Sequence, residues 1–294
     1  MAHAYTNQTQ IMWNGIIGEI TLTAKDAVSI RNLQAYPDYK NKQVKVKCLV
    51  NNTGAATSGS LNADIRTATD PVIQVQQHVT LQPGETGSTD LPDQRRSKGM
   101  ERVHAYLVHP SGIYPDRPLQ RYPRNQIRLP GFGKERAGSI IERSEDFPQR
   151  YIGVLHIPAY RIPSDGTRRL GKVFTTAREW GLNHLRFHSW CPPKAAFEVA
   201  DSLGFYLQVE LPLWSTNLCK DKRAPYLYAE ADRILEEYGN HPSFCLLSLG
   251  NELQYDFEFL GSLLNHVKEK DPRHLYTTTS FTFEKAWRLA GNER

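Results

Sequence analysis

Polar and aromatic residues that could take part in chemistry follow three apolar stretches in the second half of the sequence. These residues are His188, Trp190, Glu210, Trp214, Asn251 and Glu252. If the stretches are parallel strands of an α/β barrel, their carboxyl ends meet at one rim, where chemistry takes place in such folds. Aromatic and polar groups at one rim suit the binding of a sugar, and a carboxylate there suits acid–base catalysis. A lone glutamate after a strand is equally explained as a carboxylate at a helix N-terminus.

The elements that must position these residues alternate between helix and strand. Residues with helical spacing occupy 171–181, 192–204, 224–240 and 256–272, and apolar strands are expected at 182–190, 205–214, 243–252 and 273–281. Strands that are apolar along their length are typical of a parallel sheet covered on both sides, as in an α/β barrel or a doubly wound sheet. No G-x-G-x-x-G motif follows a strand, which argues against an oxidoreductase with a dinucleotide site.

The first third of the chain has a different sequence pattern. Between residues 19 and 93, short alternating segments such as EITLTA, QVKVKCLV and VIQVQQHVTLQP are separated by turn signals. This spacing predicts a small β-sandwich. Cys48 lies in the middle of one segment and is expected to be a small buried apolar residue.

Composition excludes several other classes of protein. The chain has 294 residues, enough for two domains, and four cysteines without a C-x-x-C pair, so neither a zinc knuckle nor a dense disulfide framework is expected. Its mean hydropathy is −0.53, and no apolar run approaches the ~20 residues of a membrane helix. The first residues lack the apolar core of a secretory signal. We predict no metal, no cofactor and no membrane partner.

Two stretches, GLNHLRFHSWCPPKAAFEVADSLGFYLQVELPLW and NHPSFCLLSLGNE, resemble the catalytic barrel of glycoside hydrolase family 2. That family includes β-galactosidases, β-glucuronidases and β-mannosidases, and the resemblance covers residues 171–280. It implies a carbohydrate substrate and retaining hydrolysis of β-glycosides. It leaves the sugar, the linkage and the oligomeric state open, and is compatible with a periplasmic or secreted full-length parent.

The resemblance also implies site roles. Glu252 would be the general acid/base, and Asn251 would hydrogen-bond the sugar 2-hydroxyl. Arg186 and His188 match an Arg-x-His motif that builds the pocket. Trp214 would either form a platform for the sugar or pack at the rim. Glu210 would belong to the substrate site but lie behind the residues that touch the sugar.

The expected architecture is multidomain, with an immunoglobulin-like β-sandwich before an incomplete (β/α)8 TIM barrel. Residues 1–18 resemble the end of a jelly-roll sugar-binding domain, 19–128 would form the sandwich, and 129–294 the N-terminal part of the barrel. The family's nucleophilic glutamate belongs to the seventh barrel strand, whereas the sequence reaches only the fifth. We therefore expect this chain to be inactive.

Residues 94–170 depart from the family pattern. They carry 15 basic against 7 acidic residues and 8 of the 18 prolines, and as written they are expected to hold neither the last sandwich strands nor the first barrel strand. Read from the second base of suitable codons, residues 140–164 give LLNGRKIFLRGTLECSIFPLTGYPP, which resembles the family's first barrel strand. We interpret 94–128, 129–170 and 285–294 as translated out of frame.

The sequence also allows other interpretations of the basic segment and of the function. The basic segment could be a nucleic-acid arm or a linker, but it has no aromatic stacking pattern, so we predict no nucleic-acid partner. The main alternative function is a non-catalytic carbohydrate-binding or scaffold protein built on the sandwich, although Tyr36 and Tyr39 are the only aromatic residues between 19 and 93.

Overall fold

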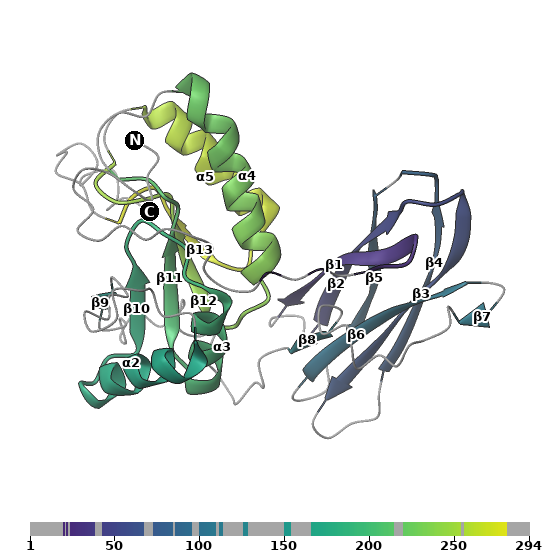
Figure 1. Ribbon diagram of the computed structural model, residues 1–294, viewed down its shortest axis with the longest axis horizontal. Coiled ribbons are helices and arrows are strands. Elements are labelled where there is room, and N and C mark those ends of the chain that lie inside the picture. The colour runs from purple at the N-terminus through teal and green to yellow at the C-terminus, as the bar shows by residue number, and fades with distance from the viewer. Residues whose placement is uncertain are drawn as a thin grey trace. The chain divides into compact units, whose positions relative to one another are not determined.

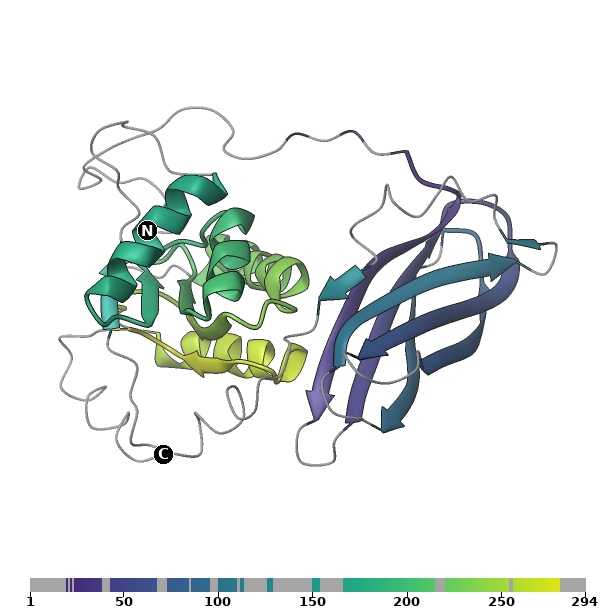
Figure 2. The same cartoon turned by 90° about the horizontal axis from the view of Figure 1, so that it is seen from below.

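The computed structural model divides into two compact units, shown in Figures 1 and 2. We call residues 20–146 the β unit, and residues 1–19 with 147–294 the α/β unit. The structure describes residues 20, 22, 24–38, 43–67, 73–84, 86–95, 100–109, 112–113, 126–128, 150–153, 166–214, 220–253 and 256–280. The jelly-roll remnant predicted at 1–18 and the tail at 285–294 lie outside the described residues, as do most of 129–165 and Cys219.

The β unit consists of two antiparallel sheets. One has the strand order β1-β2-β5 and the other β4-β3-β6-β7, with β8 paired to β6. The strands are β1 Val28–Asp38, β2 Gln43–Asn52, β3 Thr57–Thr67, β4 Ile73–Leu81, β5 Thr86–Arg95, β6 Met100–His109, β7 Gly112–Ile113 and β8 Gln126–Arg128.

Alternation along the strands creates the core of this unit. In β2, Val44, Val46 and Cys48 are buried, whereas Lys45 and Lys47 between them are exposed. Buried side chains from both sheets form one apolar cluster, to which β1, β2, β3 and β4 all contribute. The predicted β-structure of this region is therefore present, with its apolar faces turned to a common core.

One predicted strand has no strand conformation at its described residues. In EITLTA, the described residues Ile20, Leu22 and Ala24 have no strand conformation, and the side chains of Ile20 and Leu22 are exposed. Apolar alternation alone does not make a strand, because its backbone groups also need a partner in a ladder.

Several strands are not predicted from the sequence, among them β5 and β6. The sequence of β5, TGSTDLPDQR, is poor in strand formers, and the ladder with β2 passes from Val46↔Leu91 to Val44↔Gln94. Pro92 therefore falls at an irregularity, where its missing N–H does not interrupt the ladder. Within β6, Val103, Ala105 and Leu107 alternate and pair with Ile65, Ala63 and Leu61 of β3.

The expectation that 94–170 holds neither the last strands of the β region nor the first strand of the α/β region is therefore wrong. In addition to β6, the strand β9 (Arg150–Gly153) lies in this segment and pairs with the first strand of the following region. Strands are joined by hydrogen bonds between backbone groups, which every residue type except proline can donate and accept. The high content of Arg and Pro in this segment was therefore a poor guide to the presence of strands.

The α/β unit is a five-stranded parallel sheet with helices between successive strands. Its order is β13-β12-β11-β10-β9, and every neighbouring pair is parallel. Besides β9, the elements are α2 Thr167–Glu179, β10 His184–Phe187, α3 Lys194–Leu203, β11 Tyr206–Glu210, α4 Lys220–Tyr238, β12 Phe244–Ser248, α5 Phe257–Lys270 and β13 Leu275–Thr277. Each strand lies beside its neighbour in sequence, without the reversal of order that marks a doubly wound sheet.

Local sequence explains where the helices begin and end. Helix α3 begins after Pro193 and ends at Gly204, whose φ of 70° is the left-handed conformation that glycine favours.

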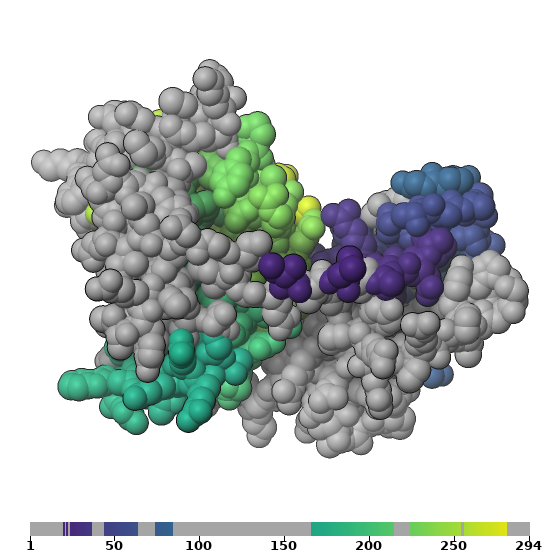
Figure 3. Space-filling view, in the orientation of Figure 1, coloured from purple at the N-terminus to yellow at the C-terminus, as the bar shows by residue number. Residues whose placement is uncertain are grey.

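Helices α4 and α5 lie side by side in Figures 1 and 2 and are joined by His266 Nε2 and Asp232 Oδ1, 2.7 Å apart. In Figure 3, atoms of α2 and α4 lie at the surface of this unit.

Large aromatic side chains fill the space between sheet and helices. The Phe197 ring of α3 stacks on Tyr238 of α4 with centroids 4.2 Å apart, and Phe174 of α2 meets Phe205 edge-on at 5.1 Å. All four strands from β10 to β13 end on the same side of this core, because they are parallel. That side is where the predicted site residues lie.

Candidate active site

A buried hydrogen-bond network joins the ends of three adjacent strands. Arg186 of β10 donates from Nε to Glu210 Oε1 of β11. Its Nη2 donates to Asn251 Oδ1, just after β12, at 2.6 Å. All three residues are buried, and Glu210 is 0% exposed. A buried ion pair is tolerated only when its remaining polar atoms are also satisfied.

The Glu210 carboxylate meets that condition. Oε2 accepts a hydrogen bond from the backbone N–H of Ser189 at 2.7 Å, and Oε1 accepts from Ser280 Oγ and, at 3.4 Å, from Gln208 Nε2. With Arg186, four donors converge on this one carboxylate. Both of its oxygens are therefore occupied by the protein itself.

Glu252 has a different environment. It is half-buried and has a φ of 52°, a left-handed conformation that is uncommon for a residue with a side chain. Trp214 donates from Nε1 to Glu252 Oε2 at 2.8 Å. The preceding residue, Asn251, forms an isolated parallel bridge with Trp214 and donates its backbone N–H to Leu213 O at 3.0 Å. These contacts hold the Glu252 carboxylate at the edge of the buried network.

Gly250 makes the close approach of these segments feasible. Its φ is 154°, and a Cβ added there would lie 2.4 Å from Leu213 O and 2.7 Å from Leu213 Cβ. The glycine before the Asn-Glu pair is thus required by the backbone packing that positions the pair.

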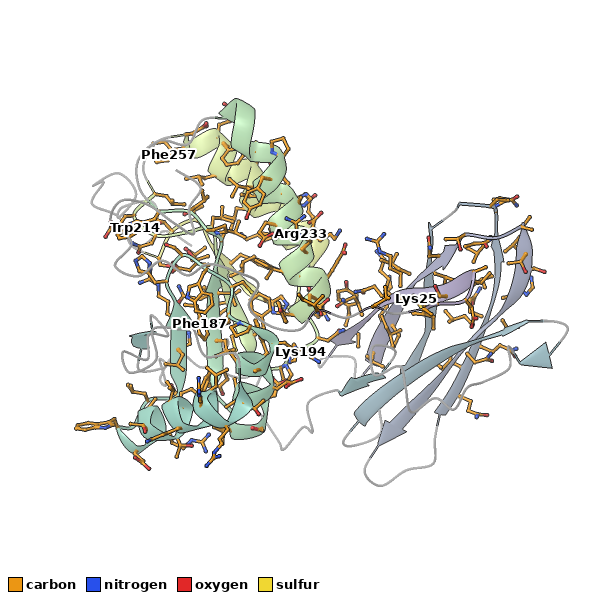
Figure 4. All side chains as sticks on the ribbon, in the orientation of Figure 1. Lys25, Phe187, Lys194, Trp214, Arg233 and Phe257 are labelled. Carbon is orange, nitrogen blue, oxygen red and sulfur yellow. The ribbon has the colours of Figure 1, made fainter. Side chains whose placement is uncertain are left out.

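His188 and Trp214 form an aromatic edge next to the carboxylates. Their ring centroids are 4.9 Å apart at 82°, and Figure 4 labels Trp214 beyond the end of β11. Burial lowers the pKa of His188; the Glu210 carboxylate opposes this shift, and the Arg186 guanidinium reinforces it. A neutral imidazole can both donate and accept a hydrogen bond.

The structure brings all six predicted site residues, Arg186, His188, Glu210, Trp214, Asn251 and Glu252, to one end of the parallel sheet. Trp190 instead packs edge-on against Phe187, with centroids 5.8 Å apart. His241 pairs through Nδ1 with Asp201 Oδ2 at 2.7 Å.

Three further members of the network were missed from the sequence: Gln208, Ser189 and Ser280. Gln208 is two residues before Glu210 on the same strand face, so the period of two was the available signal. Ser189 contributes a backbone N–H, and a sequence gives no signal for that.

Within the described residues, no three His, Cys, Asp or Glu side chains are grouped so that they could hold a metal ion. No described helix combines the length and the apolar character needed to span a membrane.

Comparison with solved structures finds a similar fold in carbohydrate-active enzymes. A β-glucuronidase from Bacteroides uniformis superposes with a TM-score of 0.60 at 16% identity, over 90% of this chain and 34% of its own. The β-D-mannosidase of Dictyoglomus thermophilum gives 0.64 at 15% identity, over 85% of this chain and 34% of its own.

An exo-chitosanase from Amycolatopsis orientalis gives a TM-score of 0.62 at 14% identity, over 87% of this chain and 32% of its own. The chain shares its fold with about a third of each of these glycoside hydrolases. The resemblance to glycoside hydrolase family 2 is thereby confirmed for the fold. The chain spans about a third of the length of these enzymes. No protein-family model and no curated protein sequence matches it.

Proposed function

We propose that the chain carries the acid/base half of the active site of a glycosidase that acts on β-glycosides, with Glu252 as the proton donor and acceptor. The observation that carries this proposal is the contrast between two carboxylates at one rim. Glu210 is fully buried and saturated with donors, whereas Glu252 is half-buried and held by Trp214 beside the aromatic edge.

In this proposal the mechanism is retaining, as the resemblance to family 2 implies. Such enzymes need a second carboxylate about 5–5.5 Å from the first to form a glycosyl-enzyme. Glu210 does not meet that need, because both of its oxygens accept protein donors. The resemblance to family 2 instead implies a nucleophile on the seventh barrel strand, beyond the five parallel strands that the structure describes.

The neighbouring residues would bind the sugar. Asn251 would hydrogen-bond a hydroxyl, which family 2 places at the sugar 2-position, while His188 and Trp214 would cover the ring and Arg186 would support the pocket. The solved structures of similar fold include a β-glucuronidase, a β-mannosidase and an exo-chitosanase. These enzymes give the range of β-linked sugars to test.

The architecture proposed for this function is an immunoglobulin-like sandwich followed by part of a (β/α)8 barrel. Supporting it are the two antiparallel sheets with one shared core and the parallel sheet whose order follows the sequence. The proposed limits remain 19–128 for the sandwich and 129–294 for the barrel.

The test measures binding, because hydrolysis needs the second carboxylate. Isothermal titration calorimetry of the 294-residue chain would use 4-nitrophenyl β-glycosides of glucuronic acid, galactose, mannose and glucosamine. A further ligand would be a basic iminosugar with the same hydroxyl configuration as the glycoside that binds most tightly. We expect Glu252→Gln to weaken the cationic iminosugar by about 10-fold or more. The two uncharged glycosides, of galactose and mannose, should weaken by about 3-fold or less, because only the cation depends on a carboxylate.

The matched control is Glu237→Gln, the same substitution at an exposed position of α4, which should bind both ligands like the wild type. Two results would overturn the proposal: no binding of any of the four glycosides, or an equal loss for cationic and neutral ligands in Glu252→Gln.

A further inference from the structure

We propose that Glu210 and Arg186 are positioning residues that fix the orientation of the Asn251 side-chain amide, so that Asn251 faces the ligand only as a hydrogen-bond donor. This inference rests on the proposed function, because it describes how the same site recognises its ligand. It assigns to the buried ion pair a role in binding that extends beyond holding the strands together.

The first step concerns the amide itself. The two ends of an asparagine amide differ, since Oδ1 accepts and Nδ2 donates. Arg186 carries only donors, and its Nη2 lies 2.6 Å from Asn251 Oδ1. Rotating the amide by half a turn would place two donors against each other. The guanidinium therefore selects one orientation, in which Oδ1 is used internally and Nδ2 remains for other partners.

The second step concerns what holds Arg186. A guanidinium is planar, so fixing Nε also fixes the direction of Nη2. Glu210 accepts from Nε and is itself held by Ser189 N–H and Ser280 Oγ. With Glu210 0% exposed and Arg186 7% exposed, water does not compete for this pair. The direction of the Asn251 amide is thus set by residues from β10, β11 and the segment after β13.

The consequence concerns the ligand. An amide that presents only N–H groups requires an acceptor oxygen, such as that of a hydroxyl, and disfavours a cationic ammonium at the same place. Glu210 takes part in this selection without touching the ligand.

The test is a double-substitution cycle with Asn251→Asp and Glu210→Gln. Asn251→Asp removes the donor and places a second carboxylate beside Arg186, while Glu210→Gln removes the first. Together they restore one carboxylate per guanidinium. Each protein is measured for its melting temperature and for its affinity toward the 4-nitrophenyl β-glycoside that the wild type binds most tightly. Matched controls are Asn265→Asp and Glu237→Gln, both at exposed helix positions.

We expect each single variant to lower the melting temperature and the double variant to regain part of that loss. Affinity should behave differently. Both proteins with Asn251→Asp should bind about 10-fold or more weakly, and Glu210→Gln should weaken binding only where Asn251 is present. Recovery of stability without recovery of binding is the signature of positioning.

If binding instead follows the melting temperature across all four proteins, Glu210 has a merely structural role and the inference is overturned. If the wild type binds none of the four glycosides, the proposed function fails. The melting temperatures of the four proteins would still show whether Asn251 and Glu210 depend on each other. Additive losses of melting temperature would show that the three residues are independent, which also overturns the inference.

Discussion

At the scale of single residues, the buried Asp271 is paired with residues that follow it directly in the sequence. Asp271, 2% exposed, accepts hydrogen bonds from the Arg273 backbone N–H at 3.0 Å and from Arg273 Nε at 2.8 Å. His274 Nε2 lies 3.4 Å from its Oδ2. Burial alone would raise the pKa of Asp271, but the hydrogen bonds from Arg273 and His274 hold it well below its usual range. This turn after α5 is therefore stabilised by an ionised carboxylate.

We predict that Asp271→Asn lowers the free energy of unfolding at pH 7 by about 3 kcal/mol, because it leaves a partly buried guanidinium without its counter-ion. A depressed pKa contributes stability that is complete above the unfolded-state value and is lost as the pH falls through the folded-state value. The difference from the wild type should therefore shrink below about pH 4.

Urea unfolding at pH 7 and at pH 3 measures both quantities, with the exposed Glu269→Gln as the matched control. An equal difference at the two pH values would show that ionisation of Asp271 is not the source of the stability.

At the scale of elements, the loop after β12 depends on one glycine. We predict that Gly250→Ala destabilises the protein by about 2 kcal/mol, since the new Cβ would lie 2.4 Å from Leu213 O in a backbone conformation that disfavours a side chain. Displacing Leu213 also displaces the Trp214–Asn251 bridge, so glycoside binding should fall together with stability.

Gly261→Ala is the matched control, measured in the same thermal melts and titrations. Gly261 lies inside α5, and a Cβ there meets nothing within 4 Å. Alanine should stabilise the helix by up to about 1 kcal/mol and leave binding unchanged. Equal effects of the two substitutions would argue against a special role for Gly250.

The sequence predicts the α/β elements better than the β elements, for a physical reason. The helix expected at 192–204 is α3 and the one at 256–272 is α5, because caps and apolar period are local signals. Strand β5 has no local signal and exists through its ladder with β2. Likewise, the residue types of the site were visible in sequence, whereas the backbone donor of Ser189 was not.

At the scale of the whole molecule, each unit has its own buried apolar cluster. Cys48 lies in the cluster of the β unit with 0% exposure, and burial raises the pKa of its thiol to about 12. Cys245 of β12 has a pKa raised to about 12, mainly by burial. Because the thiolate is the reactive form and the Cys48 side chain is fully buried, Cys48 reacts only when the β unit opens, whereas the half-buried Cys245 serves as the reference in the α/β unit.

We predict that Leu61→Ala, which removes a fully buried side chain of β3, destabilises the β unit by about 2–5 kcal/mol. Alkylation by iodoacetamide, located by peptide mass spectrometry, should then become faster at Cys48 and stay unchanged at Cys245. Equal acceleration at both cysteines would contradict separate opening of the units.

The reading frame is also a property of the whole chain. Our interpretation of 94–170 and 285–294 as frame-shifted stays a prediction, because the ladders of β6 and β9 involve backbone groups. Resequencing the locus should reveal single-base corrections near codons 94, 171 and 285 that restore one long frame. A sequence confirmed at every base, with an intact protein of this sequence in cells, would refute a sequencing error.

The bridge between Trp214 and Asn251 has a consequence for how this protein can vary. The chain leaves the rim at Trp214, runs through α4 and β12, and returns to the same point at Asn251. An excursion that is tied at its base can change in length at small entropic cost, since loop closure depends only weakly on the number of residues. A difference in the length of this excursion should therefore leave the geometry at the rim unchanged.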